Sequence, residues 1–216
     1  MTFLIVLVGW IFSLTLHEFA HAFVAYQGGD WTVREKGYLT FNPLRYTHPL
    51  LSIVFPLLIL LTGGIGLPGG AVYIETWRLR SSKWETAVSL AGPSMNLVMA
   101  IALALVLRFD AVQASVFGPG LAFLAFLQIT AAMLNLLPLP GLDGYGAISP
   151  HLPWNIRQKA DQLAGASMWI LLLLMWYVPV FGDFFWGLVT FFVQFLGIPG
   201  DLAARGYGFF QFWKHL

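Results

Sequence analysis

The sequence predicts an all-α polytopic membrane protein built on a three-helix core. Of its 216 residues, 58% are hydrophobic and only 10% are charged, so the chain is too apolar for a water-soluble domain. Three apolar runs, residues 3–26, 86–107 and 121–137, have about the length that crosses a hydrocarbon core of about 30 Å. A net charge of +1, without an extended basic run, gives no reason to expect a nucleic-acid partner.

The first apolar run carries three ionisable residues in the pattern His17-Glu18-x-x-His21. On a helix the two histidines lie one turn apart, so both imidazoles project from one face and can hold one metal ion, most naturally zinc. Glu18 is then placed to take a proton from a metal-bound water, which is why this spacing is typical of metal-dependent hydrolysis. A charge at the bilayer centre costs roughly 2.5–3.5 kcal/mol on insertion scales, so we interpret the pattern as a functional site. The alternative is a polar contact between helices.

The stretch between the first and second spans is predicted to contain no further crossing. Gly28-Gly29-Asp30 ends the first helix. Residues 49–70 hold only about a dozen consecutive apolar residues before a glycine-rich stretch, which is short of a full crossing and favours a re-entrant segment. Residues 37–41 and 71–77 are rich in β-branched and aromatic side chains and predict two short strands that can pair as a β-hairpin.

The second and third spans each bring polar groups into the membrane. Asn96 needs a partner there, and the nearby Gly92 is small enough to let another helix approach closely. After the third span, two prolines and two glycines unwind the chain around Asp143, which is tolerated at membrane depth only where backbone lines a cavity or water.

The chain is therefore divided into a core of residues 1–146 and C-terminal membrane helices and a tail in residues 147–216. Residues 164–198 are apolar but are interrupted at residues 179–183. This stretch predicts either two short spans or one span and an interfacial helix.

A catalytic zinc usually has three protein ligands and one open position, so a third ligand is needed. The chain has no cysteine, which restricts the ligands to nitrogen and oxygen donors. Asp143 is the only carboxylate at a helix break beside deeply apolar sequence, and we predict it as this ligand. The other histidines are predicted to be ordinary interfacial residues: His48, His151 and His215.

This ligand set requires that His17, His21 and Asp143 all lie near the same face of the membrane. Eight basic residues then lie on the metal side and Arg108 lies opposite, while Arg205 and Lys214 join the majority if the tail crosses twice. By the positive-inside rule, the metal side faces the cytoplasm. The eight are Arg34, Lys36, Arg45, Arg78, Arg80, Lys83, Arg157 and Lys159.

Three motifs in this order resemble the site-2 protease family of intramembrane zinc metalloproteases, peptidase family M50. They are His17-Glu18-x-x-His21, Gly92-Pro93-x-x-Asn96 and Asn135-x-x-Pro138-x-x-x-Leu142-Asp143-Gly144. The resemblance covers roughly residues 3–146. It implies that His17, His21 and Asp143 bind one zinc ion and that Glu18 activates the zinc-bound water. It also implies that Asn135 stabilises the tetrahedral intermediate or positions substrate, and that Asn96 supports the site.

The same resemblance implies a metalloendopeptidase that hydrolyses a peptide bond within or near a transmembrane segment of a membrane-protein substrate. We expect it in the cell membrane of a bacterium or archaeon, as a short form without a PDZ or CBS domain. A substrate must unwind before attack, and its extended segment can pair with the predicted strand edges. We expect the glycine-rich residues 63–70 to gate entry of substrate or water. The sequence leaves the substrate and the oligomeric state open.

Two other functions compete with this hypothesis. A metal transporter also needs intramembrane His and Asp, but its polar residues continue across the membrane, and here the half opposite the site is nearly bare. A catalytically silent membrane binding protein has no need of a general base, so Glu18 argues against it.

Overall fold

The computed structural model describes residues 1–45 and 72–211, and every regular element in those residues is a helix. Three of these helices are long and apolar enough to cross a membrane: α1 (Thr2–Gly28), α4 (Ser82–Val106) and α6 (Gly118–Asn135). They match the three predicted spans, so the chain is a multi-pass membrane protein. The remaining helices are α2 (Thr32–Glu35), η1 (Pro43–Arg45), η3 (Thr76–Arg78), α5 (Asp110–Gln113), α7 (Asp143–Ile148), η4 (Ser149–His151), α8 (Trp154–Asp161), η5 (Ala164–Ala166), α9 (Ser167–Tyr177), α10 (Pro179–Phe195) and α11 (Gly200–Phe210).

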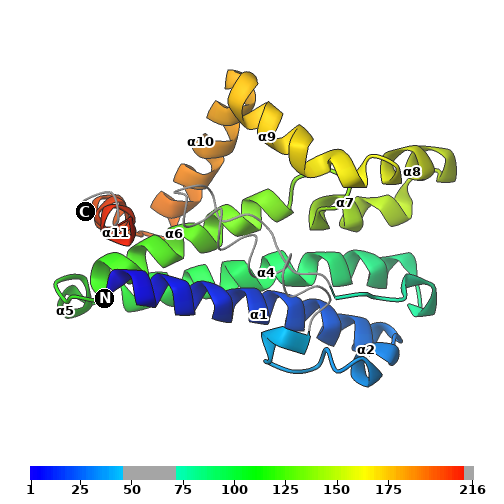
Figure 1. Cartoon of the computed structure of the whole chain (residues 1–216), viewed down its shortest axis with the longest axis horizontal. Coiled ribbons are helices and arrows are strands. Elements are labelled where there is room, and N and C mark those ends of the chain that lie inside the picture. The colour runs from blue at the N-terminus through cyan, green and yellow to red at the C-terminus, as the bar shows by residue number, and fades with distance from the viewer. Residues whose placement is uncertain (46–71, 212–216) are drawn as a thin grey trace.

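The helices α1, α4 and α6 lie side by side, and α6 is the most deeply buried of them (Figure 1). In its most apolar stretch 89% of α6 is buried, against 39% for α1 and 33% for α4, because α10 and α11 also pack on α6. Small side chains make much of the buried contact, which lets the helices approach closely. They include Ala100, Ala104, Ala122, Ala125 and Ala132.

The helices α9 and α10 form a V whose apex stands away from α6, while the end of α10 packs on α6 (Figure 1). The chain bends by 97° at Val178, because the following proline disfavours helical backbone there and itself begins α10. The break lies just before the predicted residues 179–183. With 11 residues, α9 is too short to cross alone, so the V supplies one bent crossing at most.

The helix α11 packs at the end of the bundle where the chain begins (Figure 1). A Cβ on Gly206 would collide with the Pro119 carbonyl at the start of α6, and Phe210 stacks on Phe3 with 5.4 Å between ring centroids. The structure therefore places Arg205 at the same end as Arg108. The sequence placed Arg205 on the metal side only if the tail crosses the membrane twice. Residues 147–211 do not cross twice, so Arg205 does not lie with the other basic residues.

The two predicted strands are not found, since residues 37–41 and 72–77 contain no strand. Gly37, with φ +74°, turns the chain after α2. Side chains take backbone groups that a strand ladder would need: Lys36 Nζ donates to the Tyr73 carbonyl, and Asp30 accepts from the Glu75 N–H. The predicted re-entrant segment 49–70 and its gate 63–70, together with His48 and His215, lie outside the described residues.

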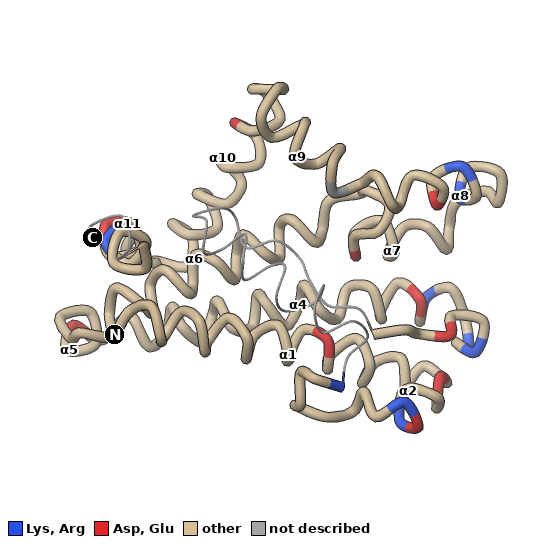
Figure 2. Tube along the Cα trace, viewed as in Figure 1, with Lys and Arg blue, Asp and Glu red and all other residues tan. Residues whose placement is uncertain are grey.

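Charged residues gather at the end of the bundle that carries α2, α8 and the start of α4 (Figure 2). Among the residues that the structure describes, eight of the ten Lys and Arg side chains belong to segments at this end, and Arg108 and Arg205 belong to the other. The predicted excess of Lys and Arg on the metal side is therefore found, with eight residues at the metal end and two at the opposite end.

Candidate metal centre

Three side chains converge between the end of α6 and the middle of α1. His17 and His21 project from one face of α1, and their Nε2 atoms are 3.0 Å apart. Asp143, the first residue of α7, places Oδ2 3.3 Å from His17 Nε2 and Oδ1 3.4 Å from His21 Nε2. One potential ligand atom from each residue lies within 4.8 Å of the others. The structure thus brings together the three residues that the sequence singled out as ligands.

The orientation of both imidazoles is fixed through their other nitrogen. His17 Nδ1 donates to the side-chain oxygen of Asn96, and His21 Nδ1 donates to the Val88 carbonyl at 2.7 Å. Because both partners are oxygen acceptors, the ring proton belongs on Nδ1, and the lone pair of each Nε2 faces the centre. This is the arrangement in which outer contacts prepare histidines for a metal.

Asn96 is itself oriented by Gln128, a residue that sequence reasoning missed. The Asn96 Nδ2 group donates to Gln128 Oε1 at 2.9 Å, so the chain of contacts from His17 through Asn96 reaches α6. Gln128 is fully buried in the middle of a transmembrane helix. An amide in such an apolar run is itself a signal of function and could have been recognised as one.

Gly92 on α4 leaves the room that the imidazoles occupy. A Cβ at this position would overlap the Nε2 atoms of both His17 and His21. The obstruction would come from rigid rings held at their far nitrogens, so neither ring can move away cheaply. Glycine therefore lets α4 approach the site end of α1.

Asp143 is delivered by the turn that follows α6. This turn folds back so tightly that a Cβ on Gly144 would collide with the Leu136 carbonyl. Asp143 Oδ2 is buried and accepts no hydrogen bond from the residues that the structure describes, although a buried carboxylate oxygen normally has a partner. Together, the two neutral imidazole nitrogens and this anionic carboxylate oxygen form a donor set that suits zinc.

Glu18 and Asn135, the two predicted catalytic residues, are both buried. Glu18, 3% exposed, accepts a hydrogen bond from the Val72 N–H at 3.1 Å through its Oε2 atom. Asn135 is the last residue of α6, at the start of the turn that carries Asp143. His151 lies apart from the cluster and contacts the Thr86 hydroxyl at 2.9 Å.

Comparison with known proteins agrees with the geometry. The family model described as peptidase family M50 matches residues 3–117, which include the two histidines, Glu18 and Asn96. Rip2 of Mycolicibacterium smegmatis and Rip2 of Mycobacterium tuberculosis, both named as zinc metalloproteases, are 46% identical to the chain, with 98% of this chain and 82% of each relative covered.

A more distant relative carries the same kind of name. YwhC of Bacillus subtilis, also named as a zinc metalloprotease, is 32% identical, and the match covers 83% of each protein. No solved structure matches the chain. The chain therefore belongs to peptidase family M50, the site-2 protease family of zinc-dependent metalloproteases.

Proposed function

We propose that the chain is an intramembrane protease that hydrolyses a peptide bond within or near a transmembrane segment of a membrane-protein substrate. The observation that carries this proposal is the convergence of two imidazoles of the membrane-spanning α1 with the carboxylate that follows α6, beside the buried Glu18. Ionisable groups in such helices are costly and are normally retained for function.

In this proposal His17, His21 and Asp143 hold one zinc ion. Zinc, when bound, supplies a Lewis acid that polarises the scissile carbonyl and lowers the pKa of a water toward neutrality. Glu18 takes the proton of the attacking water and delivers it to the leaving nitrogen. Asn96 keeps the His17 ring in its binding orientation. The buried side-chain amide of Asn135 donates a hydrogen bond to the substrate and positions its peptide group.

The depth of the site limits which peptide bonds it can reach. Along α1, His21 and His17 precede the terminal Gly28 by roughly 10 and 16 Å at 1.5 Å per residue. Because hydrogen bonds protect the backbone of a helix, the substrate must unwind on this side of the bilayer before attack. The excess of Lys and Arg at the same end supports a site that opens toward the cytoplasm.

A transport function is less consistent with the residues that the structure describes. Within residues 1–45 and 72–211, one group of His, Cys, Asp and Glu residues has the geometry to hold a metal ion. The other end of α1 packs on α6 and α11 through apolar side chains such as Val6 and Phe123. Among the described residues, no second group with metal-binding geometry therefore continues a path across the protein.

The test compares wild type with Glu18→Gln in cells that co-express a library of tagged single-span reporters. Zinc is measured on both purified proteins. We expect Glu18→Gln to keep zinc, since Glu18 is not a proposed ligand, and to lose cleavage. Cleavage that persists in Glu18→Gln would remove Glu18 as the base. Zinc binding without Glu18-dependent cleavage of any reporter would contradict the protease function and favour binding or transport.

A further inference from the structure

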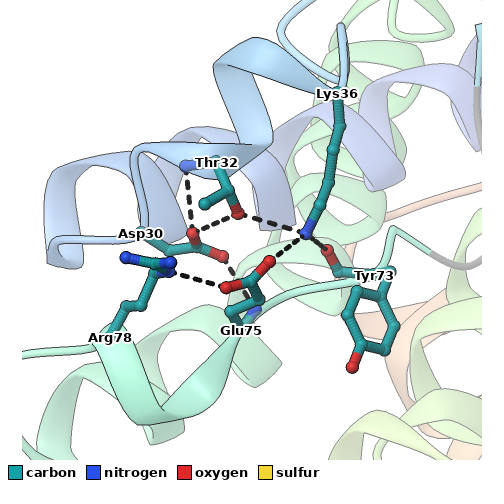
Figure 3. Close-up of polar contacts among 6 residues, drawn as sticks. All are labelled: Asp30, Thr32, Lys36, Tyr73, Glu75 and Arg78. Atoms are coloured by element: carbon teal, nitrogen blue, oxygen red, sulfur yellow. Dashed lines mark hydrogen bonds and ion pairs between the residues drawn. The ribbon is translucent and has the colours of Figure 1, made fainter.

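A cluster of polar side chains joins the end of α1 to the segment that enters α4 (Figure 3). Its centre is Asp30, which is fully buried just after α1 ends. One Asp30 oxygen accepts from the N–H and the hydroxyl of Thr32, at 3.1 and 2.6 Å, and the other accepts from the Glu75 N–H at 2.8 Å. A buried carboxylate with these three donors is a fixed anchor.

Lys36 and Glu75 form the second layer of this cluster. Lys36 Nζ lies 2.8 Å from Glu75 Oε1, 3.3 Å from the Tyr73 carbonyl and 3.1 Å from the Thr32 hydroxyl. Arg78 binds the other Glu75 oxygen at 2.6 Å. Hydrogen bonds from Arg78 and Lys36 lower the pKa of Glu75 to about 2, so the carboxylate stays charged near neutral pH.

Besides pairing charges, the cluster holds backbone groups of the segment that leads into α4. Lys36 holds the Tyr73 carbonyl, Asp30 holds the Glu75 N–H, and further along Arg80 N–H donates to the Gly28 carbonyl at 3.0 Å. Val72 and Ile74, from the same segment, pack against a buried cluster that includes residues of α1. Residues 72–75 are therefore held against α1 by both polar and apolar contacts.

One backbone group of this held segment points at the catalytic site. The Val72 N–H donates to Glu18 Oε2 at 3.1 Å. A backbone N–H has no rotamers of its own, so its direction is set by the placement of the segment. The Asp30, Lys36 and Glu75 contacts begin one residue further along the chain and set that placement.

We propose that Asp30, Lys36 and Glu75 are positioning residues for Glu18. They hold residues 72–75 so that the Val72 N–H immobilises one oxygen of the Glu18 carboxylate and leaves the other, Oε1, for proton transfer. The inference rests on the proposed function, since it assigns Glu18 the role of base. The side chains of Lys36, Glu75 and Arg78 keep 18–27% of their surface exposed, and ion pairs that solvent reaches contribute little to stability, so a purely stabilising role explains less of this arrangement.

The first test is the kinetics of Lys36→Met on a cleavable reporter, with Lys36→Arg as the conservative variant. We expect kcat to fall about tenfold or more in Lys36→Met, because small displacements of a catalytic group are costly, with KM and zinc content unchanged. Lys36→Arg should restore most of the loss. Lys83→Met, which removes an exposed lysine at the start of α4, is the matched control and should behave as wild type.

The second test needs no turnover and uses hydrogen exchange on zinc-free protein. In Lys36→Met the amides of residues 72–75 should exchange faster than in wild type, whereas Lys83→Met should leave them unchanged. Unchanged exchange in Lys36→Met would overturn the inference, and so would faster exchange with an unaltered kcat. If wild type cleaves no reporter, the proposed function fails. Independently of that result, unchanged exchange of residues 72–75 in Lys36→Met rejects the role of Asp30, Lys36 and Glu75 in holding this segment.

Discussion

The two ends of the three-helix bundle are held together by different kinds of contact. At the metal end a hydrogen-bonded chain from His17 through Asn96 to Gln128 connects α1, α4 and α6. At the opposite end Gly9 packs against the Leu124 side chain, and Phe3 stacks on Phe210 of α11. Directional contacts fix atoms at the first end, whereas the second end requires only that apolar volume be filled.

Glycine permits close approach at both ends, but for different reasons. Gly92 faces two imidazoles whose far nitrogens are hydrogen-bonded, so the obstacle to a larger residue is rigid. Gly9 faces the end of a leucine side chain, which has other rotamers. The same substitution at the two positions should therefore separate loss of the site from loss of packing.

Gly92→Ala should produce the largest effect. The added Cβ overlaps both Nε2 atoms, so it displaces the two atoms that are proposed to bind zinc. We expect zinc affinity to fall by about 100-fold or more, at the upper end of what outer contacts cost a metal site. Competition with a chelator on purified protein measures this change, and reporter cleavage should disappear with it.

Gly9→Ala is the matched control for that variant. Its Cβ meets a flexible side chain, so we expect about 1–3 kcal/mol of lost stability from overpacking and no change in zinc affinity. Thermal unfolding and the same chelator competition check both points. Equal losses of zinc in the two variants would show that the ends do not differ in the proposed way.

Asn96→Ala should give the next largest effect. It removes the acceptor that orients His17 but leaves every proposed ligand in place. Loss of such an outer contact typically costs about 10–100-fold in metal affinity. Chelator competition measures the loss, and Asn96→Asp, which keeps an oxygen acceptor for His17, should recover part of it. No recovery would indicate that packing, not the hydrogen bond, is what matters at this position.

The sequence predicted which three side chains converge because chemistry leaves few choices. Without cysteine the ligands must be His, Asp or Glu, and Asp143 was the one carboxylate at an unwound helix end. Gln128 could not be assigned a partner in this way. Its contact with Asn96 joins different helices 32 residues apart in the chain, and the pattern of apolar residues does not specify which faces meet.

The same distinction explains the fold. The three long helices were predictable because a bilayer sets their length and composition. The expected strands were wrong because backbone groups of residues 73–75 bind side chains of Asp30 and Lys36. Such contacts depend on tertiary placement, which local propensity does not contain. The packing of α11 on α6 was missed for the same reason.

Gln128→Leu should have a smaller effect than Asn96→Ala. The substitution keeps the volume of the buried side chain but removes the acceptor of the Asn96 amide, so Asn96 loses orientation while it keeps its contact with His17. We expect zinc affinity to fall less than about tenfold, since the change acts one contact further from the metal. Chelator competition decides, and a loss as large as that of Asn96→Ala would place Gln128 closer to the metal than the structure does.

Glu75→Gln should give the smallest effect on zinc affinity, and the pH dependence of its stability separates the two ends again. The pKa of Glu75 falls from 4.5 to about 2 on folding, so its stabilising contribution is complete above about pH 4.5. As pH falls from 4.5 through about 2 the folded protein loses that contribution, and the Tm difference between wild type and Glu75→Gln should shrink. Thermal unfolding of zinc-free protein across this range measures the difference. The Cβ added at Gly9 meets the Leu124 side chain, which does not titrate, so the Tm deficit of Gly9→Ala should not change with pH. The same pH dependence in both variants would count against an ionic contribution of Glu75 at the metal end.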